Sequence, residues 1–153
     1  KALGVQGGIV AGKEIVRNHA LNHSRSWLLS GSQPPGVAAA QKAAVEVLME
    51  EPQHHAKLWE NTEYFRKEMQ SLGFDTGVST TPIIPVMCGE SSRAKDLSQA
   101  MLDQGVMAGA IVFPMVSKDK ARVRTQMSTG LSRGDLDEVL RIFESAGKEI
   151  GLI

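Results

Sequence analysis

The sequence lacks the features that place many proteins by composition alone. Its single cysteine, Cys88, excludes an internal disulfide and agrees with a reducing compartment such as the cytoplasm. Lys plus Arg and Asp plus Glu each total 17, so no net charge draws the chain to nucleic acid. The apolar runs are far shorter than the roughly 20 residues that a membrane helix needs. We therefore expect a cytoplasmic protein that binds neither nucleic acid nor membrane.

Signatures of metal and phosphate binding are also missing. His19 and His23 are four residues apart on an expected helix, but no HExxH motif and no nearby carboxylate completes a zinc site. Neither a P-loop nor a G-x-G-x-x-G segment occurs. Cys88 stands in the apolar run PIIPVMCGE without a neighbouring base, which favours a buried core thiol over a nucleophile. We expect no metal.

Apolar residues make up 42% of the chain, which is enough for a hydrophobic core. The length of 153 residues fits one domain of ordinary size or two small ones. The first part of the chain predicts a glycine-bracketed buried strand followed by mostly helix. The expected elements are a strand at 7–12, a helix over about 13–29, and a helical stretch over 37–72 that Pro52 breaks near Glu51 and Gly73 ends.

The pattern changes near residue 75. From Thr76 the expected order is β-α-β-β-α, which indicates a small α+β layer with helices on one sheet face. The expected elements are a strand at 82–89, a helix over 91–105 with Ser91 or Ser92 as its N-cap, strands at 106–116 and 121–129, and a final amphipathic helix over 132–153. We therefore predict two domains, residues 1–74 and residues 75–153.

Three features could carry chemistry. Lys1, followed by small residues and glycines, could form a Schiff base with pyridoxal 5′-phosphate (PLP), although most terminal lysines are simply solvated. Ser30 and Ser32 precede an expected helix, where hydroxyls hold a phosphate or cap the helix. Arg122 and Arg124 share one face of an expected strand, which suits a carboxylate but also occurs on solvated strands.

Taken in order, these segments resemble one family. The segments are KALGVQGGIVAG, SRSWLLSGSQPPGVAAA, LWENTEYFRKEMQSLGFDT, TPIIPVMCG, ARVRTQMST and GKEIGLI. Together they resemble the α-oxoamine synthases, which are PLP enzymes of the fold-type I aminotransferase superfamily. The resemblance implies an α/β fold of that type, of which this chain is the C-terminal part: the end of the large PLP domain and a small α+β domain.

The resemblance also implies roles for individual residues. Lys1 matches the lysine that forms the Schiff base with PLP and removes the Cα proton, and Gly7 and Gly8 match the glycine pair behind it. Ser30 matches the hydroxyl residue that reaches the PLP phosphate of the neighbouring subunit. Arg124 matches the arginine that binds the carboxylate of the amino acid.

The implied reaction is the PLP-dependent condensation of an amino acid with an acyl-CoA in a homodimer with a shared site. RTQMS looks most like glycine C-acetyltransferases, which implies glycine and acetyl-CoA, with amino-oxononanoate synthases as the next candidates. Arg122 is then the structural arginine, and an upstream half of the enzyme completes the site. The sequence departs from the family at Ser117, often proline, and at Leu131, often histidine. The alternative is a non-catalytic ligand-sensing or interaction domain with a helical dimerisation arm.

Overall fold

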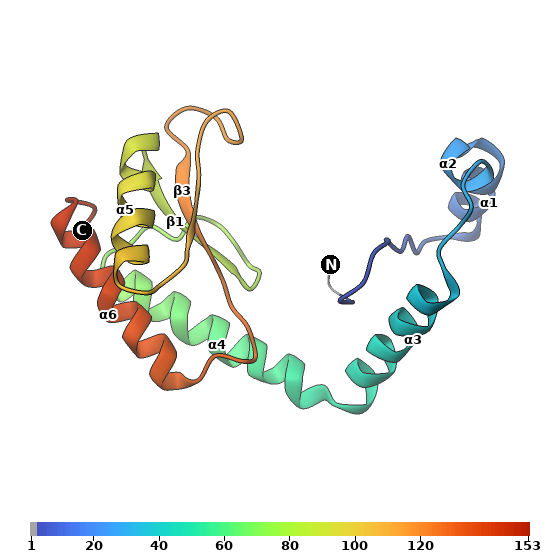
Figure 1. The fold of residues 1–153 in the computed structure, drawn as a ribbon, viewed down its shortest axis with the longest axis horizontal. Coiled ribbons are helices and arrows are strands. Elements are labelled where there is room, and N and C mark those ends of the chain that lie inside the picture. The colour runs from blue at the N-terminus through green and yellow to red at the C-terminus, as the bar shows by residue number, and fades with distance from the viewer. Residues whose placement is uncertain (1–2) are drawn as a thin grey trace. The chain divides into compact units, whose positions relative to one another are not determined.

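The computed structural model describes residues 3–153, which form two compact units that divide between Pro52 and Gln53 (Figure 1). Each unit is described separately. The helix that follows Pro52 belongs to the second unit, because its buried side chains lie in that unit's core. The domain boundary expected between residues 74 and 75 stays a prediction.

The first unit contains α1 (Glu14–His23), α2 (Arg25–Leu28) and α3 (Pro35–Glu50). None of residues 3–52 is buried. The helix expected over 13–29 is two helices, because the chain adopts an extended conformation at Ser24. The break near Glu51 is confirmed. The strand expected at 7–12 is wrong: these residues have no regular structure, because no strand of this unit pairs with them.

The second unit begins with a long helix and continues in the order β-α-β-β-α, as the sequence predicts. Its elements are α4 (Pro52–Ser71), β1 (Ile83–Gly89), α5 (Ser91–Asp103), β2 (Gly109–Ile111), β3 (Ala121–Gln126) and α6 (Arg133–Glu149). The strand order is β1-β3-β2, and β3 runs antiparallel to both neighbours. β1 and β2, which α5 connects, are therefore not neighbours in the sheet, and β3 lies between them. β1 lies at an edge of the sheet, as Pro85 within it and Pro82 just before it indicate.

The core lies on one face of this sheet. Ile84 and Val86 of β1 and Val123 of β3 are fully buried and face the helices. α5 packs against all three strands and also against α6. Cys88 is buried on the same face, where desolvation raises the pKa of its thiol, as expected for a core thiol.

Three phenylalanines join the helices to this core. The ring centroid of Phe143 lies 6.2 Å from that of Phe65 and 5.8 Å from that of Phe74, both edge to face. Gly73 ends α4 with a φ of 100°, and the Phe74 N–H donates to the Met69 carbonyl over 3.1 Å. The predicted glycine C-cap is confirmed, since this left-handed conformation favours glycine.

Helix α5 starts differently from the expectation. Its N-cap residue is Glu90, and neither Ser91 nor Ser92 caps the helix with a side chain. No helix within residues 3–153 is long and apolar enough to cross a membrane.

Removing the Phe143 ring tests this core. We expect Phe143→Ala to lower the free energy of unfolding by about 3–5 kcal/mol, because the buried ring leaves a cavity between α4, α6 and Phe74. Urea denaturation followed by circular dichroism measures the change. The control is Val78→Ala, at an exposed position, which should change it by less than about 0.5 kcal/mol. Equal effects of the two substitutions would contradict the assignment of Phe143 to the core.

Candidate cofactor and substrate sites

The segment expected to hold PLP begins at Lys1, which lies outside the described residues. Gly7 is described, and two observations require glycine there. Its φ is 115°, and a Cβ would collide with the side-chain amide of Gln33. The Gln41 amide also lies close and donates to the Gln6 carbonyl over 3.1 Å. The Gly7 segment therefore lies against α3 and the loop before it.

Gly8 has a different environment. A Cβ on Gly8 would meet no atom within 4 Å, so neither space nor conformation requires glycine. The residue lines a pocket of about 480 Å³ between this segment and the first two helices. The other lining residues are Val10, Gly12, Val16, Arg17, Ala20, Leu21, Ser24 and Trp27.

Ser30 lies in the loop between α2 and α3 and is exposed. It does not cap α3, because the N-cap residue is Pro34 and no side chain caps that helix end. Within residues 3–153 the Ser30 hydroxyl has no hydrogen-bond partner, so it is available to a ligand. Ser32 adopts a φ of 65°, which is uncommon for a residue other than glycine.

These groups fit one end of PLP. The Gly7 backbone has the side-chain amides of Gln33 and Gln41 directly against it, with no room for a Cβ. The Ser30 hydroxyl belongs to the same loop as Gln33. Neutral amide and hydroxyl donors of this kind suit a phosphate group.

The two arginines of β3 differ in their surroundings. Both lie on the sheet face opposite the core, since they alternate with Ala121, Val123 and Thr125. Arg122 Nε donates to the Lys120 carbonyl over 3.1 Å. Arg124 is exposed, and no group within residues 3–153 forms a hydrogen bond or ion pair with its guanidinium. This difference agrees with a structural Arg122 and a ligand-binding Arg124, which remain predictions.

The neighbours of Arg124 leave room beside it. In the sheet register it stands between Pro85 and Gly109, neither of which has a long side chain. A pocket of about 570 Å³ adjoins this position. The lining is mostly apolar: Phe65, Val106, Met107, Ala108, Gly109, Arg124, Thr125, Gln126, Met127, Leu131, Leu136, Val139 and Phe143. Sequence patterns do not predict this pocket, because it joins segments far apart in the chain.

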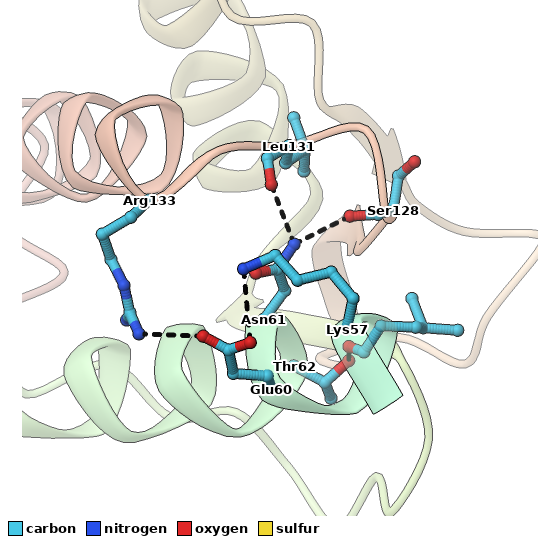
Figure 2. A network of polar contacts seen from close by, with 8 residues as sticks. Lys57, Glu60, Asn61, Thr62, Ser128, Leu131 and Arg133 are labelled. Carbon is cyan, nitrogen blue, oxygen red and sulfur yellow. Dashed lines mark hydrogen bonds and ion pairs between the residues drawn. The ribbon is translucent and has the colours of Figure 1, made fainter. Parts of the chain in front are cut away.

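Helix α4 holds the segment that follows β3, as Figure 2 shows. Asn61 Nδ2 donates to the Ser128 and Leu131 carbonyls over 2.9 and 3.0 Å. Glu60 pairs with Arg133 over 3.6 Å and with Lys57 over 3.3 Å. The sequence motif LWEN contains Asn61, but its role was not predicted. An asparagine on the apolar face of an expected amphipathic helix is the sequence feature that could have indicated this role.

The same segment is tied to α4 one turn further along. The Arg133 guanidinium carbon lies 3.4 Å from the ring centroid of Tyr64. The Tyr64 hydroxyl donates to Asp137, and this hydrogen bond raises the pKa of Tyr64 above its usual value. Within residues 3–153 no group of three or more His, Cys, Asp or Glu side chains could hold a metal ion.

Comparison with known proteins identifies the family. The family described as aminotransferase class I and II matches residues 1–143. The chain belongs to this family. PLP is the family's cofactor, and both the expected cofactor and the expected fold-type I class are confirmed.

The relatives are named for one activity. An 8-amino-7-oxononanoate synthase of Symbiobacterium thermophilum is 47% identical over all 153 residues, and one of Thermoanaerobacter pseudethanolicus is 43% identical. The chain covers 39% of the length of each. These names correspond to the second of the two expected activities, and glycine C-acetyltransferase is not shown.

Solved structures share the fold. The 8-amino-7-oxononanoate synthase of Francisella tularensis matches with a TM-score of 0.82 at 17% identity, over 100% of this chain and 44% of that one. Serine palmitoyltransferase of S. paucimobilis, in a structure with bound PLP, matches with a TM-score of 0.81 at 24% identity, over 89% and 35% of the two chains.

The start of α6 yields a pH-dependent prediction. Hydrogen bonds from the Ser132 hydroxyl and backbone N–H lower the pKa of Asp135. Because the folded pKa lies below the unfolded one, this stabilisation is present above about pH 4 and is lost as the pH falls through the lowered pKa. We expect wild type to unfold at a higher temperature than Asp135→Asn near neutral pH, and the difference to shrink in acid. Thermal unfolding across this range measures it, and a constant difference would refute the assignment.

Proposed function

We propose that these residues belong to a PLP-dependent α-oxoamine synthase that joins an amino acid to the acyl group of an acyl-CoA. The observation that carries the proposal is the 47% identity to a named 8-amino-7-oxononanoate synthase along the whole chain. Arg124, whose guanidinium has no partner within residues 3–153, is one of the residues that line a mostly apolar pocket, which supports a site for a small carboxylate. The chain spans 39% of that relative, so the activity belongs to the full-length protein.

The name of the relatives suggests a substrate pair. 8-Amino-7-oxononanoate has nine carbons, with the amine on carbon 8 and the ketone on carbon 7. If the new bond joins carbons 7 and 8, the acyl group is a seven-carbon dicarboxylic acid. The amino acid then supplies carbons 8 and 9 and loses its carboxylate as carbon dioxide, which describes alanine, while CoA leaves as the thiol. We prefer this pair to glycine and acetyl-CoA.

Each site residue has a defined role in this proposal. PLP, when bound, stabilises negative charge on the amino acid Cα. The Lys1 Nζ would hold PLP and would accept the Cα proton as a general base. The Arg124 guanidinium holds the carboxylate with two parallel hydrogen bonds, which fixes the orientation of the Cα substituents. The Ser30 hydroxyl binds the PLP phosphate.

We also propose a homodimer, because the family residue that Ser30 matches binds the PLP phosphate of the neighbouring subunit. Gly7 allows the chain behind Lys1 to approach the Gln33 amide closely, and Gly8 follows it. The non-catalytic alternative, a ligand-sensing domain with a dimerisation arm, has no observation in its favour.

The substrate pair is tested with the full-length protein loaded with PLP. We expect alanine and the seven-carbon dicarboxylyl-CoA to release CoA thiol much faster than glycine and acetyl-CoA. Lys1→Ala is the control and should abolish nearly all release, because one amine both anchors PLP and removes the proton. Thiol release is followed with a chromogenic disulfide. Faster release with glycine and acetyl-CoA would overturn the substrate pair, and near wild-type activity of Lys1→Ala would overturn the role of Lys1.

Arg124 and Arg122 provide a matched pair of variants. We expect Arg124→Lys to raise the KM for the amino acid strongly and to lower kcat, since a lysine cannot replace a bidentate guanidinium. Arg122→Lys should change stability rather than kinetics, because its partner is a backbone carbonyl. The KM for the acyl-CoA should barely change in either. If Arg122→Lys is the damaging variant, the carboxylate arginine has been misassigned.

A further inference from the structure

Asn61 is a polar side chain that is only 1% exposed, in the middle of α4. Its Nδ2 group has two N–H donors, and the structure gives each a carbonyl: Ser128 at 2.9 Å and Leu131 at 3.0 Å (Figure 2). The partners lie 67 and 70 residues further along the chain. One amide therefore fixes both ends of the turn that follows β3.

The other contacts between α4 and this region cannot replace Asn61. The ion pairs of Glu60 with Lys57 and Arg133 are exposed, and exposed pairs contribute little to stability. The bonds of Asn61 are shielded from water. Without the amide, the partly buried carbonyls of Ser128 and Leu131 lose their hydrogen-bond donor. This loss lowers the stability of the fold more than the loss of an exposed ion pair does.

The turn that Asn61 holds forms part of the wall beside Arg124. Leu131 lines the same pocket as Arg124. The strand before the turn is fixed separately, because the Thr125 hydroxyl donates to the Ile84 carbonyl over 2.7 Å and the Met127 N–H to the Pro82 carbonyl over 3.0 Å. Apart from the bonds within the turn, from the Leu131 N–H to the Ser128 carbonyl and from the Gly130 N–H to the Ser128 hydroxyl, Asn61 supplies the hydrogen bonds that the described residues give the 128–131 backbone.

We propose that Asn61 is a positioning residue for the amino acid, acting through the 128–131 turn and the Leu131 wall of the pocket at Arg124. The proposal rests on the proposed function for its substrate. It requires no contact between Asn61 and the ligand. It states that the shape of the pocket beside the carboxylate depends on a hydrogen-bonded clamp from α4.

Three variants of the full-length, PLP-loaded protein test the clamp. Asn61→Leu keeps the approximate volume and removes both donors, and Asn61→Ala leaves room for water to reach the carbonyls. The matched control is Thr62→Val in the same helix, where the lost hydroxyl bond runs only to the Leu58 carbonyl over 2.7 Å. Thr62 is fully buried, so the control loses a shielded bond without touching the turn.

Two measurements are made on each variant. Amide hydrogen exchange across residues 127–132 should be faster in both Asn61 variants and unchanged in Thr62→Val. The KM for alanine should rise roughly tenfold in Asn61→Leu and less in Asn61→Ala, while the KM for the acyl-CoA stays constant. A residue with a merely structural role would lower thermal stability and PLP content without moving the KM for alanine.

The outcomes separate this inference from the proposed function. Unchanged exchange at 127–132 in Asn61→Leu overturns the clamp, and an unchanged KM for alanine overturns its positioning role. If wild type turns over no amino acid with either acyl-CoA, the proposed function fails and the positioning role falls with it. Faster exchange confined to the Asn61 variants would then still support the clamp itself.

Discussion

The central position of β3 is the constraint on which the second unit depends. Hydrogen bonds on both of its edges fix its register against β1 and β2, and its alternation then decides what each side chain meets. Val123 points into the core, while its neighbours Arg122 and Arg124 point to the other face. A slip by one residue would bury both guanidiniums and expose Val123. Stability and the candidate carboxylate site therefore share one register.

Much of this unit could be predicted from the sequence because its signals are local. Apolar runs bounded by turn residues marked the strands, and Pro52 and Gly73 marked the ends of helices through their own backbone geometry. The strand expected at 7–12 failed because apolar residues between glycines show only that a strand could form, and pairing depends on a partner elsewhere. The clamp at Asn61 was missed for the same reason: its two partners are 67 and 70 residues away.

In the first unit the sequence predicts site residues, but the structure shows few contacts around them. Trp27, Leu28 and Leu29 are exposed in succession, and none of residues 3–52 is buried. A large exposed apolar surface calls for cover by other parts of a protein or by a partner. The predicted contacts of Ser30 and Gly8 with PLP depend on that cover. Gly7 is the exception, because its φ and its approach to Gln33 already require glycine within this unit.

Leu131 connects the clamp to the choice of substrate. The α-oxoamine synthases often have histidine at this position, and leucine makes the wall beside Arg124 apolar. A polar ring there could bind the carboxylate or offer it an alternative orientation. With leucine, Arg124 is the only charged residue among the described residues that line the pocket, and in the proposed function an apolar wall would strengthen the attraction of the guanidinium for a carboxylate by keeping water away. Under the proposed positioning role, selection of the amino acid depends on the shape of the wall, and the buried amide of Asn61, which need not touch the ligand, holds that shape through the Ser128 and Leu131 carbonyls.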